Sequence, residues 1–214
     1  MHVDRSVYNI RMNDIDLGVD IGELPARERI LRTAHDLFYA EGIRATGIDR
    51  VIAASGVTKV TFYRHFPSKN DLILAYLDLR HGRWMAWFNG ALERHGAATK
   101  DTDGRAGVGA LVPAMAEWFG GQALGEFRGC AFLNGVGEMG PTLPEVVEAT
   151  RRHKQDMTDA IAGLLPASRQ RKKIAAALSV AVDGAIVQAQ YAEDPAAVLR
   201  SLRMVVELAA HSGA

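Results

Sequence analysis

Apolar residues recur every three or four positions along most of the chain, which is the spacing of one face of an α-helix. The pattern begins after Pro25 and is first interrupted at Gly42, where a helix is expected to end. A second, short helix is predicted over 48–55, and Gly56 supplies the left-handed residue of a tight turn. No stretch alternates with the two-residue period of a strand, so the pattern predicts an all-α protein.

A third helix is predicted to begin after Thr58, a good N-cap residue, and to end before Pro67. Ser68 starts a fourth, longer helix, with Asp71 at the spacing of a capping box. Thr142 and Glu145 show the same spacing later in the chain. After a loop at 96–104, the remaining helices are expected at 105–121, 128–138, 143–164, 169–191 and 195–210.

The third helix has two distinct sides. At 100° per residue, Phe62 and Phe66 lie about 40° apart and form a stripe to be buried, while Val60 and Arg64 point the opposite way. Polar side chains flank the stripe at Lys59, Thr61, Tyr63 and His65. A short helix, a glycine turn and a second short helix that displays donors predict a helix-turn-helix.

Charge is unevenly distributed along the chain. The formal net charge is zero, but residues 26–70 carry eight Lys and Arg against four acids. Residues 1–25 carry two arginines against five acids, and residues 1–24 lack periodicity, so we expect a flexible N-terminal extension there. A locally basic segment that coincides with a helix-turn-helix indicates a nucleic-acid partner.

In a helix-turn-helix, the N-terminal residues of the second helix lie nearest the base edges of the major groove. Lys59 can donate to guanine, Val60 can touch a thymine methyl, and Thr61 suits a base edge or a phosphate. Three further side chains are better placed for phosphates, namely Tyr63, His65 and Lys69. From the spacing alone, a solvated amphipathic helix of any helical bundle remains an equal alternative.

Residues 27–77 resemble the N-terminal DNA-binding domain of the TetR/AcrR family of transcriptional regulators. The resemblance is carried by an arginine-rich first helix that ends in EG, by IDRVIAASGV, and by TKVTFYRHFPSK. It implies three DNA-binding helices followed by a larger helical domain that binds an effector and dimerises. The domains would then be 1–24, 25–67 and 68–214. Residues 129–138, GCAFLNGVGE, also resemble a segment of many members.

The resemblance also assigns roles to single residues. Lys59, Val60 and Thr61 would face bases. The family often places Ser or Thr where Thr46 and Gly47 stand, to bring the second helix against a phosphate. Gly47 has no hydroxyl, so Thr46 would supply it. The candidate DNA-binding residues are thus Thr46, Thr58, Lys59, Val60, Thr61, Tyr63, Arg64, His65 and Lys69.

Aromatic and methionine side chains are concentrated in the middle of the chain. At helical spacing, such residues are more often ordinary core than pocket lining. The glycines that interrupt this region suit a cavity, and the family resemblance implies an apolar effector there. We therefore predict an aromatic effector pocket with a few polar groups. Its candidate residues are Trp84, Trp87, Phe88, Met115, Trp118, Phe119, Gln122, Phe132 and Asn134.

Two residues have open interpretations. Cys130, the single cysteine, is either a small buried core residue or a redox sensor. Asp183 lies in an apolar run, where an unpaired carboxylate is costly to bury. It pairs with an arginine, caps a kink at Gly184, or meets an effector.

The last two predicted helices, 169–191 and 195–210, are rich in Ala, Val and Leu and carry more apolar surface than one partner requires. The resemblance implies that they form a homodimer interface. Twofold symmetry would place two recognition helices on successive faces of the major groove, so the operator should be roughly palindromic.

Other classes of protein fit the sequence less well. It has no phosphate-binding glycine motif, no HExxH, and no histidines at metal-ligand spacing, so we expect neither an enzyme nor a cofactor or metal. Neither a signal peptide nor a membrane span is indicated, which favours a cytoplasmic protein. We expect a ligand-responsive repressor that binds double-stranded operator DNA. A helical protein-interaction module without DNA binding is the alternative.

Overall fold

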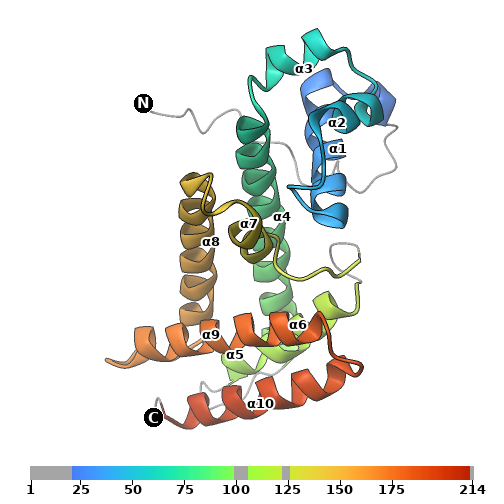
Figure 1. Ribbon diagram of the computed structural model, residues 1–214. Coiled ribbons are helices and arrows are strands. Elements are labelled where there is room, and N and C mark those ends of the chain that lie inside the picture. Colours follow the sequence, from blue (N-terminus) through green and yellow to red (C-terminus); the bar gives the residue numbers. More distant parts are fainter. Residues whose placement is uncertain (1–20, 99–105, 122–125, 213–214) are drawn as a thin grey trace. The chain divides into compact units, whose positions relative to one another are not determined.

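The computed structural model describes residues 21–98, 106–121 and 126–212, and these residues form helices joined by turns, without a strand (Figure 1). The all-α prediction is therefore confirmed. A short 3-10 helix at Ile21–Glu23 precedes the α-helices. These are α1 (Ala26–Glu41), α2 (Ile48–Ser55), α3 (Lys59–His65), α4 (Lys69–Ala98), α5 (Ala106–Gly109), α6 (Leu111–Phe119), α7 (Ala131–Met139), α8 (Pro144–Gly163), α9 (Arg171–Ala189) and α10 (Pro195–Ser212).

Several expected helix boundaries differ from the structure, and α4 continues to Ala98, into the loop expected at 96–104. The helix predicted over 105–121 is two, α5 and α6, which are separated at Ala110. The helix predicted from 128 begins at Ala131. Gly129 has a φ of 79°, which a right-handed helix does not contain, so the helix can start only after Cys130.

The capping box predicted at Thr142 and Glu145 is wrong. Leu143 is the N-cap residue of α8 and makes no side-chain cap, and Pro144 occupies the first turn. The Thr142 hydroxyl instead donates to the carbonyl of Met139 at 3.1 Å. Proline at the first helical position has no N–H to satisfy, so this helix start needs one donor fewer.

The chain forms two compact units that meet within α4, the first ending at Tyr76 and the second beginning at Leu77. In the first unit, the start of α4 packs with α1–α3. The Tyr76 ring meets Phe38 edge-on, with centroids 5.5 Å apart. The first unit has a continuous core that includes Ile30, Ala34, Phe38, Ile43, Val51, Phe62, Phe66, Leu72, Ile73 and Tyr76.

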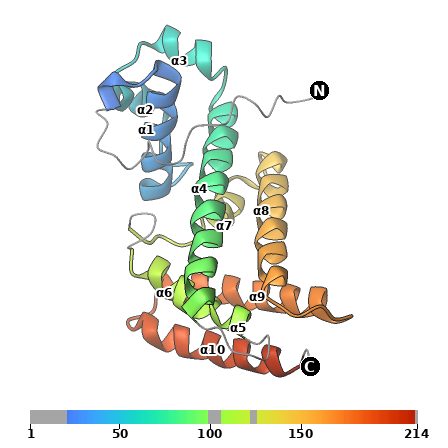
Figure 2. The same ribbon diagram turned by 180° about the vertical axis from the view of Figure 1, so that it is seen from behind.

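In the second unit, α8 lies beside the middle of α4, and α9 and α10 lie side by side at one end (Figures 1 and 2). The core between them includes Phe88, Leu111, Met115, Val146, Met157, Ile161, Leu178 and Val182. Within the described residues, every helix is too short or too polar to cross a membrane.

Candidate functional site

The helix-turn-helix of the first unit is built from local backbone chemistry. α2 ends at Gly56, whose φ of 64° and ψ of 31° lie in the left-handed region that glycine adopts without steric cost. The chain then extends through Thr58, whose Oγ1 accepts a hydrogen bond from the backbone N–H of Thr61 at 3.1 Å and caps α3. The predicted turn and cap are thus confirmed.

α3 buries one side and displays the other. Phe62 and Phe66 are 0% and 2% exposed, and their ring centroids are 6.2 Å apart. The Arg27 guanidinium of α1 lies 5.3 Å from the centre of the Phe66 ring. Val60, on the opposite side, is 71% exposed. An isolated apolar side chain held so far out of the core is available to a partner surface.

The structure brings most of the predicted DNA-binding side chains together on α3. Lys59 is exposed, with its Nζ 3.7 Å from Oδ1 of Asp49 on α2. The hydroxyls of Thr58 and Thr61 are 2.9 Å apart and hydrogen-bonded to each other. The other members lie along α3 and at the start of α4, with Tyr63 and Arg64 exposed and His65 and Lys69 half-buried.

Thr46 is a correction to the predicted set. The residue is fully buried, and its Oγ1 donates to the carbonyl of Gly42 at 2.8 Å. The hydroxyl therefore closes the end of α1 and is turned away from any phosphate. Gly47 is the N-cap residue of α2, with extended backbone and no side-chain cap.

Asp49 was missed by sequence reasoning. Its carboxylate forms an ion pair with Lys59, and both side chains are well exposed. A flexible, exposed ion pair at this distance contributes little to stability. The only sequence signal is an acid in the first turn of the helix that precedes the recognition helix.

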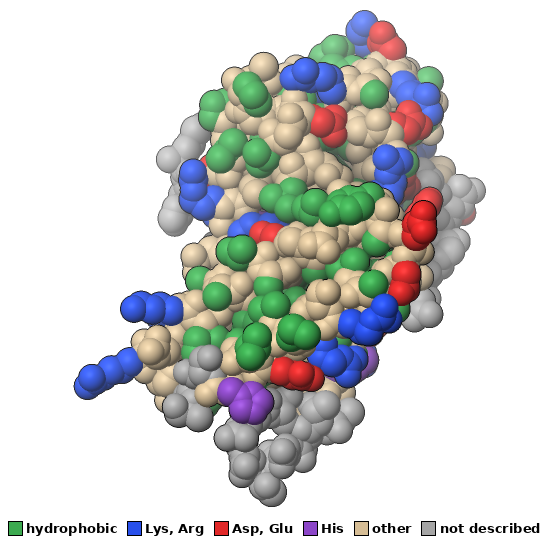
Figure 3. Space-filling model, turned by 60° about the horizontal axis from the view of Figure 1, so that its bottom comes forward, with side chains coloured by type: hydrophobic (Ala, Val, Ile, Leu, Met, Phe, Trp, Pro, Cys, Tyr) green, Lys and Arg blue, Asp and Glu red, His purple; other side chains and the backbone are tan. Residues whose placement is uncertain are grey.

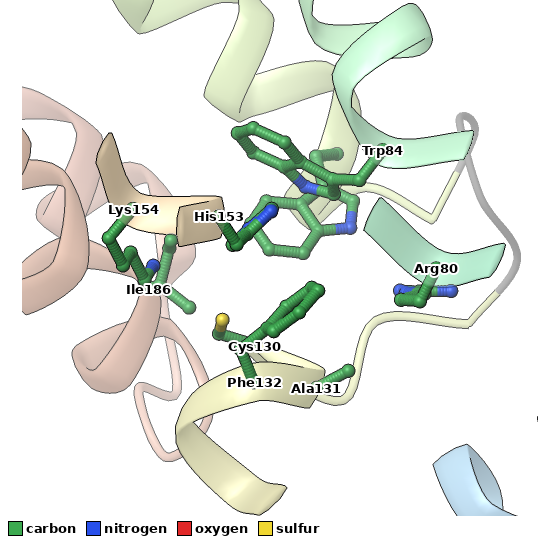
Figure 4. A pocket seen from close by; sticks show the side chains of 9 residues that line it. Arg80, Trp84, Cys130, Ala131, Phe132, His153, Lys154 and Ile186 are labelled. Carbon is green, nitrogen blue, oxygen red and sulfur yellow. The ribbon is translucent and has the colours of Figure 1, made fainter. Parts of the chain in front are cut away.

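A cavity in the second unit is enclosed by α4, α6, α7, α8 and α9 (Figure 4). It leaves a void of about 10 Å³, roughly the room of one water molecule. The lining residues are Arg80, Trp84, Trp118, Cys130, Ala131, Phe132, His153, Lys154 and Ile186.

Four of the nine lining residues carry rings, and these rings contact one another. The Phe132 ring stacks on the His153 imidazole, with centroids 3.9 Å apart and planes inclined by 8°. Trp84 meets His153 edge-on at 5.1 Å and stacks on Phe88 at 4.5 Å. Trp118 closes the cluster, with its centroid 5.7 Å from that of Trp84. Planar faces from four helices thus converge on one point.

Of the predicted effector residues, Trp84, Trp118 and Phe132 line the cavity, whereas Phe88 and Met115 are buried beside it. Trp87 and Phe119 are half-buried and do not line it. Asn134 is a correction: the residue is exposed, and its amide donates to the carbonyl of Arg128 at 3.1 Å. Gln122 lies outside the described residues.

His153 is the central polar group of the cavity, and sequence reasoning missed it. Its Nδ1 is hydrogen-bonded to Nδ1 of His81 at 3.1 Å, and Nε2 of His81 lies 3.4 Å from the Asp156 carboxylate. Burial, with smaller contributions from the positive charges of Lys154, His81 and Arg80, lowers the pKa of His153 to about 2. The imidazole is therefore neutral at ordinary pH.

Arg80 and Lys154 are the other polar residues that the sequence did not reveal. Arg80 is only 3% exposed. Lys154 makes a short ion pair of 2.5 Å with Asp183 of α9. The interpretation of Asp183 was open from the sequence, and the structure shows that its carboxylate pairs with a lysine from α8. Cys130 is buried in the same wall.

A second polar cluster fastens α4 to α6. The Glu117 carboxylate accepts hydrogen bonds from Nε1 of Trp87 at 3.0 Å and from Nη2 of Arg94 at 2.8 Å, and its other oxygen lies 3.2 Å from Nε2 of His95. Partial burial raises the pKa of Glu117, but the three hydrogen bonds together outweigh it and lower that pKa below its usual value. Trp87 is thus held beside the cavity by its indole N–H.

An apolar face covers α9 and α10. Its large exposed residues are Val180, Val187, Tyr191, Met204, Val205 and Leu208. Val180 on α9 and Tyr191 in the turn after α9 are 73% and 74% exposed, which is unusual for large apolar side chains. Figure 3 shows the hydrophobic side chains gathered on this side of the molecule.

The described residues contain no group of three His, Cys, Asp or Glu arranged to hold a metal ion.

Comparison with known proteins places these features in a family. Residues 30–76 match the family model described as bacterial regulatory proteins, tetR family. Two uncharacterised HTH-type regulators of Bacillus subtilis, YerO and YxaF, are 41% identical over 49 residues and 39% identical over 46 residues. These matches cover 23% and 22% of this chain and span only 17% and 24% of the two relatives.

Longer matches include the second unit. The transcriptional activator FasR of Mycolicibacterium smegmatis is 29% identical over 171 residues, which cover 76% of this chain and 73% of FasR. The structure of the reduced form of E. coli NemR shares the fold, with a TM-score of 0.69, 18% identity, and coverage of 86% of this chain and 96% of NemR.

The structure of SCO4454, a TetR-family regulator from Streptomyces coelicolor, superposes with a TM-score of 0.72. It is 33% identical to this protein, and the match covers 88% of this chain and 89% of SCO4454. A likeness of this extent includes both the helix-turn-helix unit and the helical unit that follows it. The chain belongs to the TetR family of transcriptional regulators and is not an enzyme.

Proposed function

We propose that the protein is a homodimeric repressor that binds a palindromic operator and is released by a small apolar or aromatic effector. The main support for DNA binding is that α3 buries one side and exposes the other. Phe62 and Phe66 fix the helix to its unit, while Val60 and the polar side chains face outward. Lys59, Val60 and Thr61 would read bases, and Tyr63, Arg64, His65 and Lys69 would contact the phosphates.

The homodimer would form through the apolar face of α9 and α10. The exposed residues of this face lie on both helices, and burying them against a second copy would remove them from water. A four-helix interface of this kind has twofold symmetry, so the same patch meets itself. Two copies of α3 would then face two half-sites, and the operator would be palindromic.

The effector would bind in the aromatic cavity of the second unit. Because the rings leave only a small void, binding requires side chains to move, and a ligand shifts a conformational equilibrium only by its differential affinity for the two states. α4 contributes Trp84 to the cavity and begins at Lys69 beside α3, so it is the natural element to carry the change. The protein would act in the cytoplasm, where it meets DNA.

Selection from a randomised duplex library at moderate salt tests the proposal. We expect a palindromic motif of two half-sites, and a reporter gene behind that motif should be silenced by the protein. Activation of the reporter would show that the protein is an activator, which is how the relative FasR is described. If no sequence is enriched at either moderate or low salt, the interaction-module alternative becomes the better explanation.

A further inference from the structure

The polar atoms on the cavity wall are mostly hydrogen-bond donors. Arg80 brings a guanidinium, Lys154 an ammonium and Trp84 an indole N–H, and no Asp or Glu is found among the nine described residues that line the cavity. The Asp183 carboxylate, which does not line the cavity, already binds Lys154. His153 is the lining residue whose ring nitrogens can accept, and it is engaged with His81.

Two of these donors are deeply buried. Arg80 is 3% exposed, and its planar guanidinium presents a fork of N–H donors. Trp84 is also 3% exposed, and its Nε1 has no hydrogen-bond acceptor among the described residues. A buried N–H without an acceptor is costly, so the indole N–H of Trp84 needs an explanation such as a missing ligand. Both residues lie on α4, four positions apart and therefore on one face of that helix.

The remaining wall favours a flat molecule. The His153 and Phe132 rings are stacked, and Trp84 and Trp118 stand at steep angles to each other around them. Phe132 is the second residue of α7, and it follows closely on Gly129, whose φ is 79°, so it lies in the first turn of the helix, where fewer backbone hydrogen bonds hold the chain. An aromatic ligand that replaced Phe132 on the imidazole would recover the same stacking contact.

We propose that this cavity binds a planar aromatic carboxylate, with the carboxylate on Arg80 and the Trp84 N–H and the ring against His153 and Trp118. A carboxylate matches the planar fork of a single guanidinium, and it brings one negative charge to a wall of donors. A phosphate monoester would bring up to two charges among apolar rings, which is far costlier to desolvate. The inference rests on the proposed function, since it names the ligand class of the effector cavity.

Calorimetric titration of the full chain without DNA tests the ligand class directly. Naphthoate is the probe, and naphthamide, which has the same shape without the charge, is its neutral match. We expect naphthoate to bind at least about tenfold more tightly, as a charge-assisted pair implies. Tighter or equal binding of naphthamide, or no binding of either probe at millimolar concentration, overturns the proposal.

Substitutions then assign the preference to residues. Arg80→Gln should abolish the preference for naphthoate, and Arg80→Lys should restore part of it. Arg151→Gln is the matched control, because it removes an equal charge from the exposed side of α8 and should change nothing. If Arg80→Gln does not fold, Trp84→Phe keeps the ring and removes the N–H, and it should weaken naphthoate several-fold and naphthamide less, because the N–H donates more strongly to a carboxylate than to an amide oxygen.

The outcomes also separate this inference from the proposed function. If the protein prefers carboxylates but enriches no duplex, the ligand site is supported and the proposal of operator binding is wrong. If the protein selects a palindromic operator but shows no preference for carboxylates, the regulator function is supported and the proposed ligand class is wrong.

Discussion

Phe132 and His153 share one stacked contact at the centre of the second unit, with their ring planes only 8° apart and their centroids separated by 3.9 Å. The first residue belongs to α7 and the second to α8. Because the imidazole is neutral there, the contact is between two uncharged rings and carries no cation–π attraction. The consequences for stability and for ligand entry can be tested separately.

The depressed pKa of His153 makes stability depend on pH. Below about pH 6.5 the unfolded chain takes up a proton at this residue, whereas the folded protein resists it down to a pKa of about 2. The stabilisation is therefore complete above pH 6.5 and is lost as the pH falls, by up to about 1.4 kcal/mol per pH unit. Chemical denaturation between pH 7 and pH 4 should show a shallower decline for His153→Phe than for the native protein. His211→Gln, an exposed control, should leave the decline as it is.

Removing the Phe132 ring should open the cavity. We expect Phe132→Ala to lower the free energy of unfolding by about 3–5 kcal/mol, the usual cost of deleting a buried ring. The same variant should bind a small aromatic probe more tightly than the native protein, because the space is already empty. Denaturation with and without the probe measures both effects. Unchanged probe binding would show that ligands do not enter here.

Lys59 and Lys69 should affect DNA binding in different ways. Lys59→Ala should relax the preference at particular base pairs by about 1–3 kcal/mol each, since a base contact is lost. Lys69→Ala should weaken all duplexes alike and lower the slope of log affinity against log salt by about one, because a phosphate contact releases counterions. Titrations of a panel of operator variants at several salt concentrations distinguish the two. An equal effect of Lys59→Ala on every variant would remove its base-reading role.

Gly47→Ser should strengthen the approach of α2 to DNA. Gly47 has the extended backbone of an N-cap residue, and a side chain there would meet no atom within 4 Å. Serine would add a cap to α2, worth a few tenths of a kcal/mol, and offer a hydroxyl to a phosphate. Anisotropy titrations should show a several-fold gain on specific and scrambled duplexes alike. Gly82→Ser, at an equally open position of α4, is expected to leave DNA binding unaltered.

A charge on the apolar face of α9 should dissociate the dimer. Val180 is 73% exposed, so Val180→Asp should leave the fold of one copy intact while making burial against a second copy costly. Sedimentation should then report monomers, and binding to a two-half-site operator should weaken. Val60→Asp places the same charge at an equally exposed valine of α3 and should impair DNA binding while the protein stays dimeric. A monomeric native protein would contradict the interface.

The sequence predicted the first unit well because local chemistry decides it. Gly56 forms the turn, Thr58 caps α3, and the Ser68 hydroxyl accepts a hydrogen bond from the backbone N–H of Asp71 at 3.2 Å. Each of these interactions joins residues that are at most four positions apart. Thr46 was misjudged for the complementary reason. Its hydroxyl donates a hydrogen bond to the carbonyl of Gly42, directly after α1. The local sequence does not indicate whether the side chain of Thr46 faces the core or the solvent.

The cavity was only partly predictable because its contacts are distant in sequence. The aromatic residues were visible as a group, but the hydrogen bond between His81 and His153 joins positions 72 residues apart. Arg80 and Lys154 look like ordinary surface cations of amphipathic helices. Their burial follows only from the packing of α8 against α4 and α9, which hydrophobic periodicity does not specify.

The division of the chain inside α4 determines how the DNA-binding part could be isolated. Leu72, Ile73 and Tyr76 are at most 1% exposed and complete the core beneath α1 and α3. A fragment cut where the recognition helix ends would lose all three and expose the rings that hold α3 in place. An independently folding fragment must therefore carry at least the first two turns of α4, to Tyr76.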